Sequence, residues 1–237
     1  MGIATTPFPG QAFCMSPHAP IIAPSILACD FGHFSSESAD AIRAGGDWIH
    51  CDIMDGHFVP NISFGADVVK AVSKSTPAPL DVHLMISRPD IYWPRFHEAG
   101  AAMITVHVEA DHDVAATLKA IRAAGCKAGL AINPPSEFST VEPFLDQIDL
   151  LLVMTVNPGF GGQKFIHETV KKIEFGATWR AAHGATWRLE VDGGIAEETA
   201  GICGKAGADT YVAGSSVFGA ADRAAAIAAI RANAAAH

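Results

Sequence analysis

Short apolar runs alternate with alanine-rich stretches of helical character eight times between residue 20 and the C-terminus, and this alternation restricts the possible folds more than any other feature of the chain. Strands that alternate with helices pair in parallel, because each helix carries the chain back across the sheet. Eight such units in roughly 215 residues match a (β/α)8 barrel, whose typical length is about 250 residues. The pattern therefore predicts an α/β fold, a single-domain TIM barrel over residues 20–237. An open doubly wound sheet is the alternative, but it would normally carry fewer strands in this length.

Glycine or proline stands at most of the predicted junctions between strands and helices. The predicted strands are Ile21–Leu27, Trp48–Met54, Leu80–Met85, Met103–Val108, Lys127–Ile132, Leu150–Val156, Trp187–Asp192 and Thr210–Ala213. The predicted helices are Ser35–Ala44, Ala66–Ser73, Pro89–Ala99, Val114–Ala124, Val141–Gln147, Lys164–Ala182, Glu197–Ala206 and Asp222–Ala235.

Residues 1–19 stand apart from this pattern, because they contain several prolines and glycines, no lysine or arginine, and no periodicity. They match neither a signal peptide nor a transit peptide, so we expect a flexible N-terminal extension. The five cysteines are scattered without CxxC pairing, which indicates reduced thiols and a cytoplasmic location. The net charge of −9 argues against a nucleic-acid partner. No apolar run approaches the roughly 18 residues that a membrane span needs.

Polar side chains occupy one face of three predicted strands. Alternate residues of a strand share a face, so the apolar Ile49, Cys51 and Ile53 of the second strand should lie against helices. The opposite face of this strand, like that of the third and seventh strands, then points into the barrel. The carboxyl ends of barrel strands form the usual active-site face. The polar residues expected there are His50, Asp52, His83 and Asp192.

Two imidazoles and two carboxylates that converge in this way suit a divalent metal such as Zn, Fe, Mn or Co. The alternative for each residue is a structural role, since buried histidines are often simply hydrogen-bonded in the core. Arg188 and Glu190, one layer deeper, are expected to pair with each other. His107 and Glu109 share a face of the fourth strand, and we interpret them as supports of the site or as polar core residues.

Glycine-rich segments follow each of the last three predicted strands. Glycine permits the close backbone approach that lets several N–H groups converge on an anion. The phosphate site of many barrels lies after strands seven and eight, near a short extra helix, which Ser215–Phe218 could form. The segment 157–163 is also typical of a mobile lid. The residues concerned are Gly159, Phe160, Gly161, Gly162, Gly193, Gly194, Gly214 and Ser215. Three methionines near strand ends, Met54, Met85 and Met154, are either core filler or an apolar cap over the reacting carbon.

These segments resemble those of the ribulose-phosphate 3-epimerase family, in order and over residues 21–218. The matching segments are 23–28, 50–61, 81–85, 157–163, 191–195 and 213–218, of which the second and sixth are long and specific. The resemblance implies a (β/α)8 fold and interconversion of D-ribulose 5-phosphate and D-xylulose 5-phosphate, a step of the pentose phosphate pathway or the Calvin cycle. It also implies a homo-oligomer, dimeric or hexameric. The extension and the loop 133–136 are the parts least like the family.

The resemblance further implies one divalent metal ion per subunit, held by His50, Asp52, His83 and Asp192. Asp52 and Asp192 would be the acid and base that act on opposite faces of C3 through an enediolate. The expected substrate-binding residues are Ser25, His83, Asp192 and the eight residues of the glycine-rich segments named above. An epimerase of another ketose phosphate, such as D-allulose 6-phosphate, remains an alternative, as do a non-catalytic phosphate-binding barrel and a metal-dependent aldolase or decarboxylase.

Overall fold

Eight parallel strands form one sheet in the order β1-β8-β7-β6-β5-β4-β3-β2, in the computed structural model, which describes residues 19–236. The strands are β1 (Ile21–Pro24), β2 (Ile49–Met54), β3 (Leu80–Met85), β4 (Met103–His107), β5 (Lys127–Ile132), β6 (Leu150–Met154), β7 (Arg188–Asp192) and β8 (Thr210–Ala213). An isolated parallel bridge between Ser25 and His50 joins the two edges, so the sheet closes on itself. The predicted TIM barrel is confirmed.

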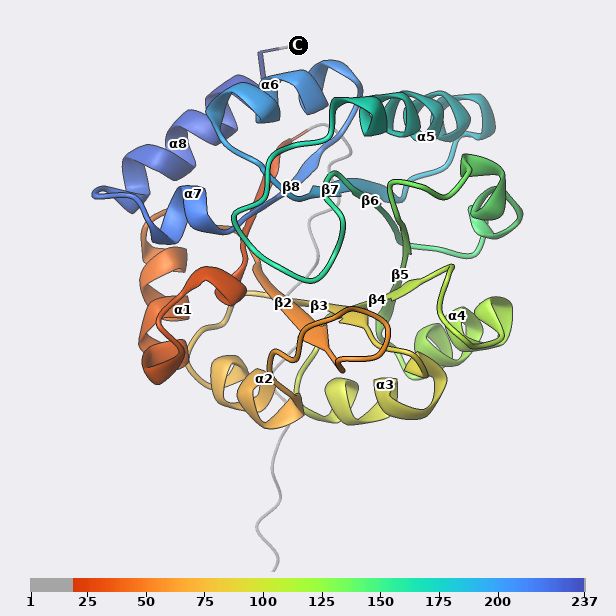
Figure 1. The fold of residues 1–237 in the computed structure, drawn as a ribbon, viewed down its shortest axis with the longest axis horizontal. Coiled ribbons are helices and arrows are strands. Elements are labelled where there is room, and N and C mark those ends of the chain that lie inside the picture. Colours follow the sequence, from red (N-terminus) through yellow and green to blue (C-terminus); the bar gives the residue numbers. More distant parts are fainter. Residues whose placement is uncertain (1–18, 237) are drawn as a thin grey trace, which may run out of the picture.

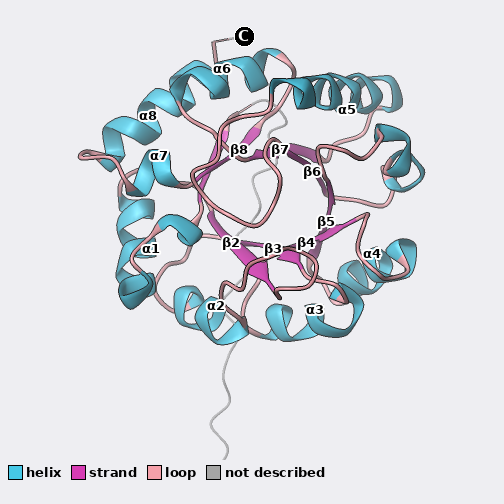
Figure 2. Cartoon of the chain, viewed as in Figure 1, coloured by secondary structure: helices cyan, strands magenta, loops and turns pink. Residues whose placement is uncertain are grey.

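Helices surround this ring of strands on its outside (Figures 1 and 2). They are α1 (Phe34–Arg43), α2 (Ala66–Ser73), α3 (Pro89–Glu98), α4 (Val114–Ala123), α5 (Val170–His183), α6 (Glu197–Lys205), α7 (Ser215–Phe218) and α8 (Arg223–Ala234). The short helix expected after the last strand is therefore present as α7. Within residues 19–236, none of the helices combines the length and apolar character that crossing a bilayer requires. The predicted extension lies outside the described residues except for Ala19.

The two faces of the strands divide as the alternation of side chains predicts. Ile49, Cys51 and Ile53 of β2 belong to the large apolar cluster between strands and helices. A smaller apolar cluster fills the interior of the barrel and includes Trp48 and Leu152. The polar residues share this inner face with the apolar cluster, since Leu152 lies beside Glu190 in the register. Parallel register places Asp52 beside His83, Met154 beside Asp192 and, deeper in the barrel, His50 beside Asp81.

Three predicted elements differ from the structure by more than two residues. The predicted strand Ile21–Leu27 ends at Pro24, because Ser25 caps a 3-10 turn (η1, Ile26–Ala28) and its Oγ accepts a hydrogen bond from the Leu27 amide. The predicted helix Val141–Gln147 is wrong, since two 3-10 turns, η3 (Phe138–Thr140) and η4 (Glu142–Phe144), take its place. The backbone bonds in this stretch join residues three apart, as from the Phe144 amide to the Val141 carbonyl at 3.0 Å, which is the 3-10 pattern.

The predicted helix Lys164–Ala182 begins later, at Val170, after the 3-10 turn η5 (His167–Thr169). The Ile166 amide donates to the Thr155 carbonyl at 2.8 Å, so the chain before the helix is extended and held against the end of β6. The loop after β6 is therefore longer than expected. It lies over the mouth of the barrel (Figure 1).

Candidate active site

A cavity of about 350 Å³ opens at the carboxyl ends of the strands. Its walls come from the loops after β1, β6, β7 and β8, and its base includes Asp52 and Asp192. Of the residues expected to bind substrate, the cavity is lined by Ser25, Gly159, Phe160, Gly161, Gly162, Asp192, Gly193, Gly194, Gly214 and Ser215. His83 is fully buried and is not among the residues that line the cavity, so the structure places it differently from the other expected substrate-binding residues.

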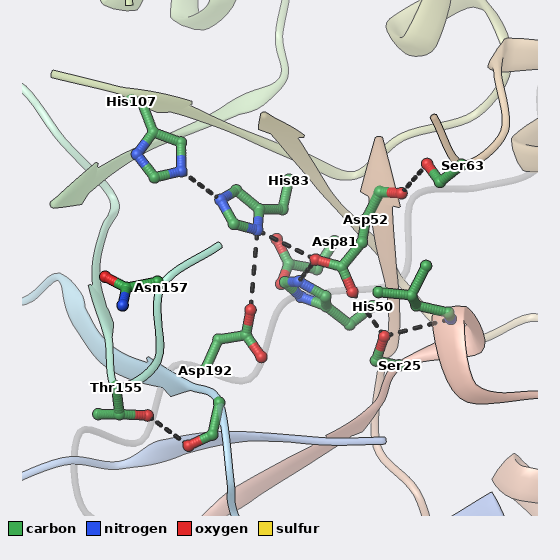
Figure 3. A network of polar contacts seen from close by, with 12 residues as sticks. Ser25, His50, Asp52, Ser63, Asp81, His83, His107, Thr155, Asn157 and Asp192 are labelled. Atoms are coloured by element: carbon green, nitrogen blue, oxygen red, sulfur yellow. Dashed lines mark hydrogen bonds and ion pairs between the residues drawn. The ribbon is translucent and has the colours of Figure 1, made fainter. Parts of the chain in front are cut away.

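The four expected metal-binding side chains meet at the base of this cavity (Figure 3). Each of His50, Asp52, His83 and Asp192 offers a donor atom within 4.8 Å of the donor atoms of the others. Asp52 is central, because its Oδ1 lies 3.2 Å from both His50 Nε2 and His83 Nδ1. Asp192 Oδ2 lies 3.9 Å from His83 Nδ1. A cluster of two imidazole and two carboxylate donors suits a first-row divalent cation.

The far side of the His50 ring supports this interpretation. His50 Nδ1 lies 2.7 Å from Asp81 Oδ2, so this nitrogen carries the proton that the carboxylate accepts. A neutral His50 then points the lone pair of Nε2 at an oxygen of Asp52. Two electron-rich atoms that face each other at 3.2 Å repel unless a cation or a proton lies between them. The donor set therefore fits a bound metal ion, and without one a proton would take its place.

The pKa of His50 reflects the two carboxylates beside its ring. Burial lowers the pKa of this imidazole, but the carboxylates of Asp52 and Asp81 outweigh burial and raise it well above its usual value. Burial also lowers the pKa of His83, to about 4, despite its contact with Asp52. His83 is therefore a neutral imidazole at neutral pH, the form in which histidine binds metals.

The two carboxylates differ in their ionisation. Burial raises the pKa of Asp52, but without a metal ion the charge of His50 and hydrogen bonds from both histidines outweigh burial and bring the pKa below its usual value. Ser25 Oγ also donates to Asp52 Oδ2 at 2.6 Å. For Asp192, burial and the negative charge of Asp52 raise the pKa to about 7. One carboxylate is thus ionised at neutral pH, while the other retains its proton in part of the molecules.

Two threonines hold the glycine-rich loop after β7 in place. Thr155 Oγ1 donates to the Gly193 carbonyl at 2.6 Å, as Figure 3 shows, and Thr199 Oγ1 donates to the Gly194 carbonyl at 2.9 Å. Gly193 has φ of +120°, a conformation that side chains rarely allow. The backbone of this loop therefore approaches the cavity without intervening side chains. Its neighbours Gly214 and Ser215 belong to the turn that begins α7.

The loop after β6 is tied down at two points. Gln163 Nε2 donates to the carbonyl oxygens of Asn157 and Phe160, at 2.7 and 2.8 Å, and so holds the loop in shape. Asn61 Nδ2 donates at 2.7 Å to the Gly159 carbonyl, which connects this loop to the one after β2. The Phe160 ring is 54% exposed at the tip. These contacts place the lid expected from the sequence over the cavity.

The three methionines, Met54, Met85 and Met154, line the cavity. Met54 and Met85 form a small apolar cluster with Val59, against which Leu27 and Phe58 pack. Met154 belongs to the smaller apolar cluster in the interior of the barrel. The side chains thus combine the two roles considered for them, since they fill space and also present an apolar wall to the cavity.

Several neighbours of the site were not identified from the sequence. Asp81 lies on the same inward face as His83, which is a signal that could have marked it as a partner for a histidine. Ser63 Oγ donates to the Asp52 carbonyl, and Asn61 binds the lid, but both come from an irregular loop in which no periodicity identifies contacts.

The expected pair of Arg188 and Glu190 is not what the structure shows. Arg188 has Asp209 as an ionic partner, with Nη1 and Oδ1 3.5 Å apart. Both carboxyl oxygens of Glu190 lack a hydrogen-bond partner among residues 19–236. Burial and the charge of Asp81 raise the pKa of Glu190 well above its usual value, which disfavours the charged form that would pair with arginine.

Comparisons with known proteins agree with this geometry. The sequence model of the ribulose-phosphate 3 epimerase family matches residues 21–218. A ribulose-phosphate 3-epimerase of Bacillus subtilis (strain 168) is 48% identical over 211 residues, which cover 89% of this chain and 97% of the relative. One from Rhodobacter capsulatus is 49% identical over 199 residues, 83% of this chain and 85% of the relative. Among solved structures, 3-hexulose-6-phosphate synthase from Salmonella typhimurium has the same fold, with a TM-score of 0.67, 18% identity, and coverage of 90% and 98%.

Proposed function

The chain belongs to the ribulose-phosphate 3-epimerase family, and from this premise we propose that it interconverts D-ribulose 5-phosphate and D-xylulose 5-phosphate by inverting the configuration at C3. The observation that carries the proposal is the pair Asp52 and Asp192, which face one cavity from strands β2 and β7 with pKa values displaced in opposite directions. Two carboxyl groups whose environments separate their pKa values are suited to act as base and acid.

Inversion at C3 needs removal of a proton from one face of the carbon and delivery of a proton to the other. In the ribulose-to-xylulose direction, ionised Asp52 accepts the C3 proton and protonated Asp192 donates from the opposite wall. In the reverse direction the two side chains exchange roles. Ser25 Oγ, which donates to Asp52 Oδ2, keeps the other carboxylate oxygen of Asp52 oriented toward the histidines.

His50, Asp52, His83 and Asp192 would hold the divalent cation in this proposal, one per subunit. When bound, such an ion stabilises as a Lewis acid the negative charge that develops on the enediolate. The donor atoms suit Zn, Fe, Mn and Co alike, so the chemistry of the site does not select one of these metals.

The phosphate would lie at the opposite end of the cavity, against the backbone of the loops after β6, β7 and β8. The glycines there allow N–H groups to approach an anion closely, which matters in a chain with net charge −9. Holding this remote group places C3 between the carboxyl groups. The lid formed by residues 157–163 would exclude water from the reacting carbon. Met54, Met85 and Met154 would form the apolar wall on the other side of that carbon.

Two further features belong to the proposal. The free thiols of Cys29, Cys51, Cys126 and Cys203 are consistent with a cytoplasmic enzyme, placed in sugar oxidation or carbon fixation. Exposed aromatic side chains such as Phe175, which is 58% exposed, are consistent with a homo-oligomer, a dimer or a hexamer.

Proton exchange in D₂O tests the proposed reaction. The metal-loaded protein is incubated with D-ribulose 5-phosphate, and C3 is followed by NMR. Deuterium at C3 together with the appearance of D-xylulose 5-phosphate is the expected result. Exchange only with a six-carbon ketose phosphate would assign a different substrate, and a change in mass would indicate C–C cleavage. The absence of exchange with any ketose phosphate would refute the epimerase assignment.

The variants Asp52→Asn and Asp192→Asn test the roles of the carboxyl groups in the same assay. Loss of the acid or base slows turnover by at least about 10²-fold. The metal content of each variant, measured by elemental analysis, separates loss of the proton-transfer group from loss of the ion. Turnover like that of the wild type in either variant would contradict the proposal that both carboxyl groups transfer protons.

A further inference from the structure

A chain of side chains runs from His83 away from the cavity to the loop after β5. His83 Nε2 lies 2.8 Å from His107 Nε2, and His107 Nδ1 lies 3.0 Å from Glu109 Oε2. The first of these contacts is drawn in Figure 3. Both imidazoles are fully buried. The hydrogen bonds that His83 can make on this side therefore depend on His107, and those of His107 depend on Glu109.

Glu109 is ionised and is held from its other side. Its Oε1 accepts hydrogen bonds from the Asn133 amide at 2.8 Å and from Ser136 Oγ at 2.6 Å. Burial raises the pKa of Glu109, but hydrogen bonds, above all with His107, outweigh burial and lower it below its usual value. An ionised carboxylate can only accept hydrogen bonds, so His107 Nδ1 must carry a proton.

The remaining protons follow once a metal ion is bound. A metal ion on His83 Nδ1 would take the lone pair of that nitrogen, so the proton of a neutral His83 would lie on Nε2. His107 Nε2 would then accept a hydrogen bond from His83 Nε2, and His107 Nδ1 would donate to Glu109. The opposite arrangement, with a proton on His83 Nδ1, would require a proton on His107 Nε2, and so either a protonated Glu109 or a His107 protonated on both nitrogens.

We propose that His107 and Glu109 are positioning residues, which hold His83 in the tautomer whose Nδ1 lone pair faces the metal site. This inference rests on the proposed metal site. Asp81 acts in the same way on His50, but in direct contact, whereas Glu109 acts through a second imidazole. Carboxylates behind ligating histidines orient the ring and increase its basicity as a ligand.

The loop after β5 contributes to the site only through this chain of contacts. None of its residues 133–136 lines the cavity. Lys172 Nζ, on α5, donates to the Asn133 and Pro134 carbonyls at 2.7 Å each, which fixes the loop that in turn holds Glu109. This segment, the part of the barrel least like the family in sequence, is therefore connected to a proposed metal ligand.

The variant Glu109→Gln tests this role. A glutamine replaces one carboxylate oxygen by an NH₂ group, which cannot accept the hydrogen bonds from His107 and from the loop at the same time. Loss of such a partner typically reduces metal affinity by about 10–100-fold. Glu137→Gln is the matched control, because Glu137 lies in the same region, is exposed and makes no contact with His107.

Affinity for Co²⁺ is measured by competition with a chelator, and the absorption spectrum of the Co²⁺ protein reports the ligand geometry. We expect Glu109→Gln to lose about 10–100-fold in affinity and to change the spectrum, while Glu137→Gln matches the wild type. Circular dichroism checks that each variant is folded. Equal affinity and equal spectra for the two variants would overturn the inference. A wild-type protein that binds no metal would instead refute the proposed function.

The tautomer itself is measured on the Zn²⁺-loaded wild-type protein by ¹⁵N NMR of its histidines, which needs no variant and no activity. The expected spectrum shows a proton on Nε2 of His83 and none on Nδ1, and a proton on Nδ1 of His107. A proton on His83 Nδ1 with a bare Nε2 would overturn the inference.

Discussion

Replacing Gly193 by alanine tests whether the loop after β7 depends on a residue without a side chain. Gly193 has φ of +120°, and a Cβ atom on this residue would lie 2.4 Å from Val156 Cγ2 and 2.8 Å from the Val156 backbone nitrogen. The methyl group of Val156 could move slightly, but its backbone is part of the segment that joins β6 to the lid. The Gly193 loop must therefore shift outward or remain strained.

The expected loss of stability follows from two contributions. Holding a residue with a side chain at this φ costs about 1–3 kcal/mol. Forcing a methyl group into a packed site costs about 1–3 kcal/mol more. We therefore expect the free energy of unfolding to fall by about 4 kcal/mol, which most single domains survive, since their stability is about 5–15 kcal/mol.

Denaturant unfolding of Gly193→Ala measures this loss, and the KM for D-ribulose 5-phosphate measures its effect on the site. A displaced loop reduces phosphate binding, and each 1.4 kcal/mol lost raises KM about tenfold. Gly161→Ala is the matched control. A Cβ at Gly161 would meet nothing within 4 Å, and Gly161 has no positive φ. The expected change in the free energy of unfolding is therefore within about 0.5 kcal/mol.

The comparison between the two alanine variants shows whether the loop after β7 tolerates a side chain and whether it holds the phosphate. If Gly193→Ala unfolds at the same denaturant concentration as Gly161→Ala, the loop tolerates a side chain and the steric reasoning is wrong. If Gly193→Ala is destabilised but its KM stays at the wild-type value, the loop is rigid for structural reasons and does not hold the phosphate.

Two other predictions concern Asp192 and the lid. Because the pKa of Asp192 rises from 3.8 to about 7 on folding, the folded metal-free protein binds this proton more tightly than the unfolded chain, and its free energy of unfolding should fall as the pH rises through that window. Urea unfolding in chelator at about pH 5 and about pH 8 should show a smaller fall for Asp192→Asn, and an equal fall would contradict the shift. Asn61→Ala removes the 2.7 Å hydrogen bond to the Gly159 carbonyl, worth about 1 kcal/mol, so KM should rise about fivefold and proteolysis within 157–163 should accelerate. Unchanged proteolysis would show that Asn61 does not hold the lid.

The elements that were predicted well depend on short stretches of sequence. Strands such as Leu80–Met85 and Lys127–Ile132 were predicted with their observed bounds, because apolar residues surrounded by glycine or proline indicate a buried strand directly. The helix expected at Val141–Gln147 was wrong even though its apolar spacing is helical, because the backbone bonds there join residues three apart in two short 3-10 turns. The late start of α5 had no sequence signal, since Ile166 pairs with a residue of another element.

The barrel, the inward faces of its strands and the four residues that meet at the base of the cavity could all be predicted from the order of residues. These features follow from the strand-helix alternation and from side-chain alternation, a property of each strand alone. The folded chain was needed to see which nitrogen of each histidine faces the site, that Glu190 does not pair with Arg188, and that Glu109 reaches His83 through His107. Those contacts join separate strands and loops, and their distances follow from register and loop conformation, which residue spacing does not encode.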